Sequence, residues 1–510
     1  MLAKVKSTGL FGINGFIVDI ETDISPGLPS FDIVGLADTA VKESRERVRS
    51  AIKNSGFDFP MKRITVNMAP GDTRKEGPAY DLAIAIGILK ATGQIVEPTE
   101  FQPIFLGELS LDGSIRPVNG VLPMLLSVSH TVHDVIVPTA NALEASHVEG
   151  MTIYAFDHLT ELVSALNKER SMQPFVISQK YISNNKKTCI EDYADVKGQE
   201  GAKRAIKIAA AGSHNLLMIG SPGTGKTMLA RRMPTILPDL TYSEAIETTK
   251  IYSAAALLDP SEGLVSTRPF RAPHHTVSSV ALVGGGRVPK PGEISLAHNG
   301  VLFLDEMPEF KKDALEVLRQ PLEDGKITVS RAQGTVSFPA KFMLIGSMNP
   351  CSCGYFGDSS HNCNCTPNQI ARYLDKISGP LLDRFDIHIE VRPISFDKLT
   401  SNYKGESSQD MKDAVDKARY IQLERYRNEG IYSNAQLNTK QINKYCKLTD
   451  SQRKMMKDAF TMLSLSARAY DRILRVARTI ADLDGVTDIK DQHIAEAIQY
   501  RSLDRQYWNY

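Results

Sequence analysis

The sequence predicts an α/β protein built from three parts: an α/β domain over residues 1–168, a second α/β domain over 193–395 and a helical domain over 396–510. Apolar, strand-like runs alternate with helical stretches through the first two parts, which is the pattern of α/β domains. The last part has the period of helices. A polar and unpatterned stretch at 169–192 separates the first two parts and predicts a linker.

The composition is that of a globular protein without an overall charge bias. Of the 510 residues, 42% are hydrophobic and 23% are charged, and the net charge is +1. Any surface that binds nucleic acid must therefore be local. No apolar run approaches the ~18 residues of a membrane span, and the start of the chain has an early acid and no long apolar run, unlike a signal peptide. We expect a cytoplasmic protein without a membrane partner.

In the first part, alternating apolar residues predict strands at 15–24 and 62–70, and a short apolar run predicts another at 134–141. The stretch 36–57 has the spacing of an amphipathic helix that ends at a glycine, where a C-cap belongs. The stretch 78–95 is more apolar and predicts a buried helix.

The second part contains three apolar strands, NLLMIG (215–220), GVLFLDE (300–306) and KFMLIGSMNP (341–350), separated by helical segments. This order predicts a mostly parallel sheet. In the third part, the clearest helix covers 466–485. Its apolar side is formed by Ile473, Leu474, Val476, Ala477 and Ile480.

A glycine-rich loop, GSPGTGKT (220–227), follows the first of these strands and opens a helix. This is the P-loop pattern in its required strand–loop–helix context. Glycines let backbone N–H groups turn toward phosphate oxygens, a lysine supplies a point charge for the β- and γ-phosphates, and a hydroxyl binds Mg²⁺. The predicted ATP-binding residues are Gly220, Ser221, Pro222, Gly223, Thr224, Gly225, Lys226 and Thr227.

Two acids end the strand GVLFLDE. Asp305 is placed to hold Mg²⁺ together with Thr227, and Glu306 is placed to polarise the attacking water. An apolar run that ends in Asp-Glu is common by itself. Downstream of a P-loop, the pair predicts hydrolysis of a nucleoside triphosphate with Mg²⁺ as cofactor.

Together, GSPGTGKT, GVLFLDE, SMNP and GPLLDRFDIHIEV resemble the magnesium-chelatase-like group of AAA+ ATPases. The flanking RPFRAPHHTVSSVALVGGG and SLSARAYDRILRVARTIADL narrow the resemblance, which covers essentially the whole chain, to the bacterial ComM/YifB family. The resemblance implies an AAA+ core with an insertion at its second helix, a C-terminal helical lid and a homo-oligomeric ring, expected to be hexameric. It also implies ATP-driven branch migration of DNA in homologous recombination and natural transformation.

The same resemblance implies roles for three polar residues. Asn349 would be the sensor-1 residue that reads the γ-phosphate, Arg384 the finger that reaches the neighbouring subunit's site, and Arg468 the sensor-2 residue. Arginine suits such roles because its planar, permanent charge stabilises phosphoryl charge. From the residues alone, Arg384 can instead pair with Asp383 or Asp386, and Arg468 can be an exposed arginine on a helix.

Two basic segments are candidates for DNA binding. Residues 263–292 contain no acid, and 326–341 predict a β-hairpin around RAQG. Repeated around a ring, their charges would make a positive channel for single-stranded or branched DNA; a solvated loop and an ordinary hairpin are the alternative. His274 and His275 alone are weak evidence for a metal site. The candidate DNA-binding residues are Lys326, Arg331, Arg287 and Lys290.

The first part resembles the proteolytic domain of Lon, which has a ribosomal S5 domain 2-like fold. The position of the Lon serine falls on Ala79 and that of its lysine on Met124. Neither side chain can act as nucleophile or base. We therefore expect no peptidase activity, and this disfavours an ATP-dependent protease.

Four of the six cysteines form two C-x-C pairs between the sensor-1 strand and the finger. In a reducing cytosol, four soft thiolates are better explained by structural Zn²⁺ than by disulfides. His361 can replace one ligand, and unligated thiols or redox pairs remain alternatives. The candidate zinc ligands are Cys351, Cys353, Cys363 and Cys365.

Two functions fit these motifs. The first is an oligomeric, ATP-driven DNA motor, which the basic segments and the Lon-like domain favour. The second is a chelatase-type ATPase that remodels a protein partner, since the core motifs would serve either function.

Overall fold

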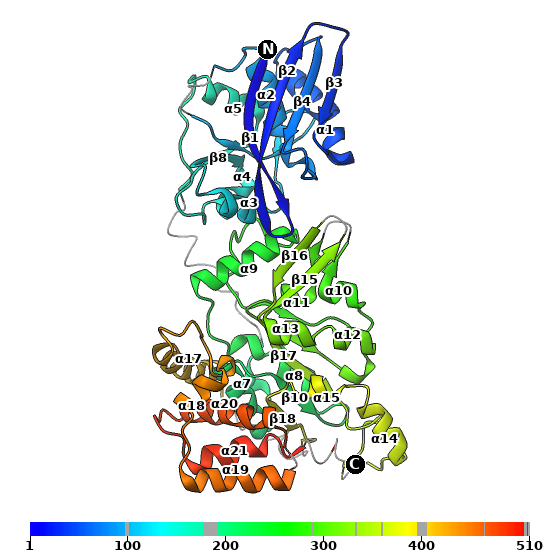
Figure 1. The fold of residues 1–510 in the computed structure, drawn as a ribbon, viewed down its shortest axis with the longest axis vertical. Coiled ribbons are helices and arrows are strands. Elements are labelled where there is room, and N and C mark those ends of the chain that lie inside the picture. Colours follow the sequence, from blue (N-terminus) through cyan, green and yellow to red (C-terminus); the bar gives the residue numbers. More distant parts are fainter. Residues whose placement is uncertain are drawn as a thin grey trace.

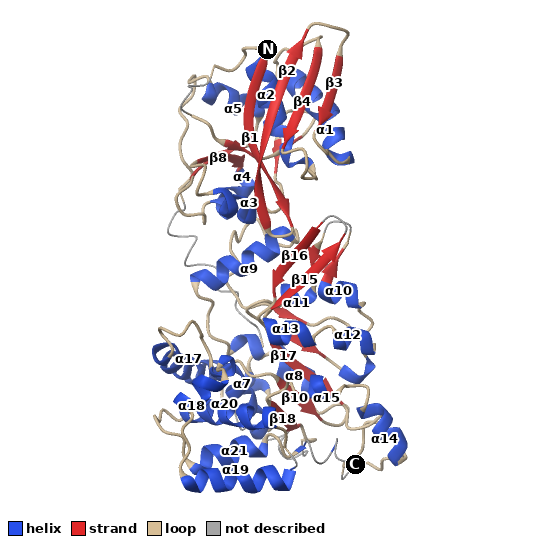
Figure 2. Ribbon diagram, in the orientation of Figure 1, coloured by secondary structure: helices blue, strands red, loops and turns tan. Residues whose placement is uncertain are grey.

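The computed structural model shows three units along the long axis of the molecule (Figures 1 and 2). We call them the N-terminal unit (to 176), the core unit (191–394) and the helical unit (from 405). The predicted linker at 169–192 falls largely outside the described residues. The structure describes residues 1–96, 101–176, 191–286, 289–331, 334–358, 361–394, 405–463, 465–503 and 507.

The N-terminal unit is a mixed seven-stranded sheet in the order β3-β4-β2-β1-β5-β8-β9. Its longest pair, β1 and β2, is antiparallel, and the last three strands run parallel. The strands are β1 (Leu2–Phe11), β2 (Asn14–Ser25), β3 (Ser30–Val34), β4 (Arg63–Ala69), β5 (Ile104–Phe105), β8 (Asp134–Pro138) and β9 (Thr152–Phe156), with the short pair β6 (Glu108–Leu109) and β7 (Ile115–Arg116). The predicted strands correspond to β2, β4 and β8.

Both predicted helices of this unit are present. Helix α1 ends at Asn54, and Gly56 follows with φ +82°, the left-handed conformation typical of a C-cap glycine. Helix α2 is buried along almost its whole length, as its apolar sequence predicts. The helices of the unit are α1 (Thr39–Asn54), α2 (Asp81–Ala91), α3 (Val121–Val128), α4 (Thr139–Ala145) and α5 (Leu159–Leu166), with the 3-10 turn η1 (Pro78–Tyr80).

The core unit contains a five-stranded sheet in the order β11-β14-β17-β10-β18, and every described pairing in it is parallel. The carboxyl ends of parallel strands meet at one edge, where α/β proteins place their ligands. The strands are β10 (Leu216–Ile219), β11 (Phe270–Arg271), β14 (Val301–Leu304), β17 (Met343–Met348) and β18 (Ile387–Glu390).

Helices and two small strand pairs surround this sheet. The predicted hairpin is present as β15 (Lys326–Arg331) and β16 (Gly334–Pro339), and β12 (Gly284–Gly285) pairs with β13 (Lys290–Pro291). The helices are α7 (Glu200–Gly212), α8 (Lys226–Arg231), α9 (Tyr242–Ala254), α10 (Ser279–Val283), α11 (Glu293–Leu296), α12 (Lys312–Glu316), α13 (Arg319–Asp324), α14 (Pro367–Leu374) and α15 (Gly379–Leu382).

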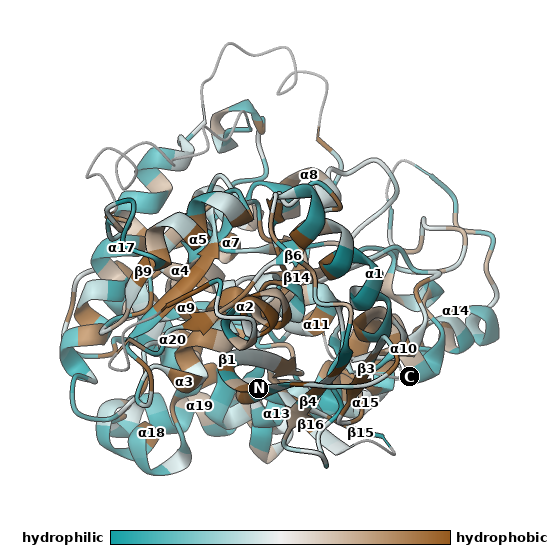
Figure 3. Cartoon of the chain, turned by 90° about the horizontal axis from the view of Figure 1, so that it is seen from above, coloured by the Kyte–Doolittle hydropathy of each residue, from teal (hydrophilic) through white to brown (hydrophobic). Residues whose placement is uncertain are grey.

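The helical unit shares a hydrophobic core with the parallel sheet. The five apolar residues predicted to form one side of α20 are all buried, and they join a cluster with residues of α7 and β10. Figure 3 shows the apolar strands lying inside and the polar helix faces turned outward. The helices are α17 (Ser408–Arg425), α18 (Thr439–Tyr445), α19 (Asp450–Leu463), α20 (Ala467–Leu483) and α21 (Asp491–Gln499).

The N-terminal unit contacts α9 and the strands of the β15–β16 hairpin (Figure 1). The Tyr242 hydroxyl donates to the backbone oxygen of His147 at 3.1 Å, and Ser253 donates to the buried carboxylate of Glu144. The turn between β1 and β2 packs on the hairpin, since Ile13 belongs to the hydrophobic cluster of the core unit. Gly334, the first residue of β16, therefore lies against Phe11 of the N-terminal unit.

Across the described parts of the chain, every helix is too short or too polar to span a lipid bilayer.

Candidate active site

The P-loop connects β10 to α8 at the carboxyl edge of the parallel sheet. Gly223 and Gly225 have φ angles of +77° and +90°, a left-handed conformation that L side chains rarely adopt. The glycines of the motif are thus required by the turn of the loop. This turn lets successive backbone N–H groups face an anion.

Lys226 begins α8, and its side chain is folded back over the loop. Its Nζ donates to the backbone oxygens of Gly220 at 2.7 Å and Ser221 at 3.0 Å, and to Asn349 Oδ1 at 3.2 Å. Burial lowers the pKa of Lys226, while Asp305 and Glu306 oppose this shift. The ammonium group is therefore held where a phosphate can replace backbone oxygens as its partner.

The strand β14 places its two acids beside the loop. Thr227 Oγ1 donates to Asp305 Oδ2 at 2.6 Å, so the two predicted Mg²⁺ ligands are in contact. Glu306 is exposed and has a φ of +51°, which turns the chain sharply after the strand. One acid is thus directed at the Thr227 hydroxyl, and the next lies at the surface of the site.

Ser347 was missed by the sequence analysis and connects the two acids. This fully buried residue on β17 donates its hydroxyl to Asp305 Oδ1 and accepts the backbone N–H of Glu306 at 3.2 Å. The SMNP motif could have indicated this residue. Ser347 lies two residues before the predicted sensor Asn349, on β17, which is the neighbour of β14 in the sheet. Ser347 fixes the turn that presents Glu306.

The structure therefore brings together Lys226, Thr227, Asp305 and Asn349, with Glu306 at the edge of the group. The register pairs Ile219 with Met348 and Leu304 with Gly346, which carries these side chains to one edge of the sheet. This arrangement can hold a triphosphate and Mg²⁺, because the donors, the hydroxyl and the carboxylate that each requires lie next to one another.

Arg384 and Arg468 form a separate group. Arg384 follows α15, is 8% exposed and pairs with Glu323 on α13 rather than with either acid considered from the sequence. Burial lowers the pKa of Arg384, and the charges of Arg468 and Arg319 lower it further. Arg468 is exposed at the start of α20, whereas Arg384 is buried against Glu323.

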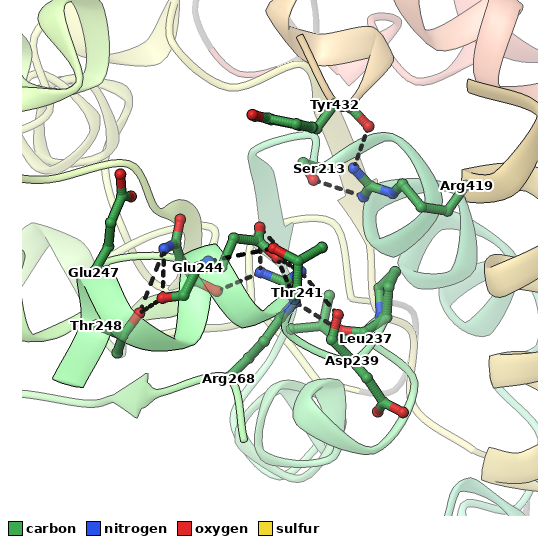
Figure 4. A network of polar contacts seen from close by, with 12 residues as sticks. Ser213, Leu237, Asp239, Thr241, Glu244, Glu247, Thr248, Arg268, Arg419 and Tyr432 are labelled. Carbon is green, nitrogen blue, oxygen red and sulfur yellow. Dashed lines mark hydrogen bonds and ion pairs between the residues drawn. The ribbon is translucent and has the colours of Figure 1, made fainter. Parts of the chain in front are cut away.

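A polar cavity of about 680 Å³ opens between the core unit and the helical unit, and Arg384 lines it. Figure 4 shows the network along one wall of this cavity. There Arg268 donates to both oxygens of Glu244, at 3.2 and 3.0 Å, and Arg419 donates to Ser213 Oγ at 2.8 Å and to the backbone oxygen of Tyr432 at 3.0 Å. Arg419, on α17 of the helical unit, thus binds Ser213 of the core unit, whereas the pair of Arg268 with Glu244 lies within the core unit.

The structure divides the basic segments. Arg271 makes two 2.7 Å hydrogen bonds to Glu293, so its charge is neutralised, as is that of Arg268. By contrast, Arg331 and Lys290 are exposed, and the Arg331 guanidinium lies beside Gly285, the register partner of Lys290.

The other two candidates do not join this pair. Lys326 is exposed at the opposite end of the hairpin, roughly 17 Å away along the strand. Arg287 lies outside the described residues. Of the four candidates, Arg331 and Lys290 are therefore the two that the described residues show close together.

Ala79 and Met124 lie in the same hydrophobic cluster of the N-terminal unit, and both are buried. Ala79 belongs to the short 3-10 turn before α2, and Met124 belongs to α3. Apolar packing thus occupies the two positions at which the Lon resemblance expects its serine and lysine.

The four cysteines of the C-x-C pairs converge on one point. All four sulfurs lie within 4.8 Å of one another, and Cys351 Sγ is 3.3 Å from Cys353 Sγ and 3.7 Å from Cys363 Sγ. Four sulfurs placed tetrahedrally around one ion at ~2.3 Å would be roughly 3.8 Å apart. The cluster therefore has the size of a four-thiolate metal site.

Comparison with known proteins places all three units in one family. The model described as magnesium chelatase, subunit ChlI, matches residues 192–399, that of subunit ChlI of Mg-chelatase matches 20–141, and that of the subunit ChlI C-terminal region matches 405–501. The chain is also 28% identical over 177 residues to the magnesium-chelatase 38 kDa subunit of Rhodobacter capsulatus. This match covers 31% of this chain and 50% of that subunit.

Two relatives match over their full length. Competence protein ComM of Haemophilus influenzae is 46% identical over 507 residues, covering 99% of this chain and 98% of that protein. The YifB protein of Escherichia coli is 42% identical over 506 residues, with the same coverage. The chain belongs to the ComM/YifB family of magnesium-chelatase-like AAA+ ATPases.

Proposed function

We propose that this protein is an ATP-driven DNA motor that works as a homo-oligomeric, hexameric ring and moves branched DNA joints in homologous recombination and natural transformation. The observation that carries the proposal is the contact of Lys226, Thr227, Asp305 and Asn349 at one sheet edge. The similarity to a competence protein over nearly the whole chain favours DNA as the substrate of this ATPase.

In the proposed hydrolysis step, the P-loop N–H groups and Lys226 bind the β- and γ-phosphates. Thr227 and Asp305 would hold Mg²⁺, which neutralises charge on the phosphates when bound. Glu306 accepts a proton from the attacking water, and Asn349, already bonded to Lys226, orients the γ-phosphate. The hydrogen bonds of Lys226 with Asn349 and of Thr227 with Asp305 support these roles.

In this proposal, two arginines complete the ATP site of the neighbouring subunit. Arg384 is the finger, and Arg468 acts beside it as the sensor-2 residue. The proposal is supported by the position of Arg384, which lines the cavity between the core unit and the helical unit, because none of the P-loop residues lines that cavity. In this proposal hydrolysis requires a ring, because the finger of one chain acts on the P-loop of the next.

We place the DNA-binding surface on the β15–β16 hairpin and the β12–β13 pair. Arg331 and Lys290 supply its closest charges. Lys326 lies at the other end of the hairpin, and Arg287, outside the described residues, stays a candidate from the sequence alone. A few positive charges per subunit, repeated around a ring, bind the phosphate backbone strongly without raising the net charge of the chain. This explains how a chain with a net charge of +1 can hold DNA.

Arg331→Ala and Lys290→Ala are expected to weaken DNA binding and to leave ATP hydrolysis without DNA unchanged. The logarithm of DNA affinity falls linearly with the logarithm of salt concentration. Each lost phosphate contact makes this fall shallower by about 0.9 for duplex DNA. The measurement is DNA affinity at several salt concentrations. Lys454→Ala, an exposed charge on α19, is the matched control; an unchanged slope in the hairpin variants would remove these residues from the DNA surface.

We include Zn²⁺ as a structural cofactor held by Cys351, Cys353, Cys363 and Cys365. Purified, untagged protein is expected to contain about one zinc ion per chain, because four thiolates make one closed site. Cys363→Ser is expected to lose the ion, whereas Cys446→Ser, outside the cluster, is expected to keep it. Elemental analysis checks this, and metal-free protein with four reactive thiols would contradict it.

The second candidate is a chelatase-type ATPase that remodels a protein partner, which the matches to magnesium chelatase subunit models favour. ATP hydrolysis measured with DNA, and with no addition, separates the two. We expect duplex or branched DNA to raise the rate. A rate that DNA leaves unchanged would favour the protein remodeller.

A further inference from the structure

The loop that carries the cysteines packs directly on the P-loop. We define it as residues 351–365, of which 359–360 are not described. Ser221 Oγ, in the P-loop, donates a 2.7 Å hydrogen bond to Asp358 Oδ2. The Asp358 side chain is only 2% exposed, so this contact is shielded from water. The cysteine loop thus reaches the first residues of the phosphate-binding turn.

A second contact lies beside the first. Gly354 has a φ of +89°, and a Cβ placed on it would stand 2.7 Å from Cδ of Pro222, the next P-loop residue. A side chain at this position would collide with the proline ring. Two neighbouring P-loop residues are therefore supported by two residues of the cysteine loop, one through a hydrogen bond and one through close backbone packing.

Regular secondary structure does not hold this loop in place. Its described residues contain no helix or strand between the end of β17 and the start of α14. The two ends of the loop meet at the sulfur cluster, in which Cys353 Sγ and Cys363 Sγ are 3.6 Å apart. Gly354 and Asp358 both lie between these cysteines, so a metal ion there would close the segment that contacts the P-loop.

We propose that zinc at the four cysteines holds Asp358 and Gly354 against the P-loop and thereby sets the nucleotide affinity of this subunit. The inference rests on the zinc site proposed above. A P-loop binds phosphate through backbone N–H groups that must already face the ligand, so fixing Ser221 and Pro222 in advance lowers the entropy cost of binding. Without the metal, both supports are freed together. Asp358 is a positioning residue, because it acts through Ser221.

The test is the affinity for a fluorescent ADP analogue, measured without DNA. Zinc-loaded protein is compared with the same protein after treatment with a zinc chelator, and with the variants Asp358→Ala and Asp358→Asn. We expect chelation and Asp358→Ala each to weaken binding roughly tenfold, the effect of losing a buried hydrogen bond to a charged group. Asp358→Asn keeps an acceptor at the same place and should stay within about threefold of the unmodified protein.

The controls distinguish an effect of the cysteine loop on nucleotide affinity from the zinc assignment on which it rests. Asp375→Asn, an exposed carboxylate after α14, should change neither zinc content nor affinity, and Asp358→Ala should keep its zinc. Full affinity after verified zinc loss, or tighter binding by Asp358→Ala, would overturn the inference. Iron in place of zinc, or no metal, would overturn it together with the zinc assignment. Because no DNA is present, the result does not depend on whether DNA stimulates the ATPase.

Discussion

Lys226→Ala is expected to abolish nucleotide binding, whereas Glu306→Gln is expected to bind ATP and hydrolyse it roughly 100-fold or more slowly. The reason is the division of labour at the sheet edge. Lys226 is buried against the P-loop oxygens and grips phosphate, while Glu306 is exposed and acts only on water. Binding of a fluorescent ATP analogue and the steady-state rate of ATP hydrolysis distinguish the two effects.

Glu309→Gln provides the matched control, because this acid lies three residues beyond Glu306 and is exposed. It pairs with Lys376 at 3.4 Å and makes no described contact with the P-loop. We expect its ATPase rate to match that of the unmodified protein. Turnover by Glu306→Gln close to the unmodified rate would contradict the role given to Glu306.

Arg384→Ala is expected to bind ATP normally and to hydrolyse it about 1,000-fold more slowly, the usual effect of removing an arginine finger. Mixing it with Lys226→Ala subunits should restore activity. One partner then supplies an intact P-loop and the other an intact finger. The ATPase rate across mixing ratios is the measurement.

Arg384 is paired with Glu323 of its own chain and must leave that partner to reach a neighbouring subunit. Glu323 is about half exposed and can release the arginine without leaving a buried charge behind. Arg453→Ala, which removes an exposed arginine of α19 paired with Asp450, is the control and should not alter the rate. If mixed rings form and no ratio restores hydrolysis, Arg384 does not act on a neighbouring subunit.

The nucleotide site could be predicted from the sequence because its chemistry is local. The P-loop is one continuous segment, and Asp305 and Glu306 follow an apolar run that had to be a strand of the same sheet. Parallel pairing then brings the two together without further information. The predicted β10, β14 and β17 lie where this reasoning requires them.

Contacts between distant segments could not be predicted in the same way. Asp358 lies 137 residues from Ser221, and nothing in the intervening pattern indicates their hydrogen bond. The pairing of Glu323 with Arg384 also depends on how α13 packs beside α15. Such partners are set by tertiary packing, which periodicity does not record.

The basic segments show the limit of reasoning from charge. Residues 263–292 contain no acid, yet Glu293, directly after the segment, and Glu244, on α9 before it, neutralise Arg271 and Arg268. The hairpin was predicted by its alternation and turn, and β15 and β16 confirm it. Its packing against the β1–β2 turn was not foreseen, because that contact joins two separately folded units.

The proposal that this protein is a DNA motor is tested most directly by its action on a synthetic four-way DNA junction with one labelled strand. We expect the unmodified protein with ATP and Mg²⁺ to convert the junction into two duplex products, one of which carries the label and is visible on a native gel. Glu306→Gln should bind the junction and leave it intact, because it binds ATP but does not complete hydrolysis. A junction that stays intact with the unmodified protein under conditions of active ATP hydrolysis, or that is resolved equally by Glu306→Gln, would contradict an ATP-driven DNA motor.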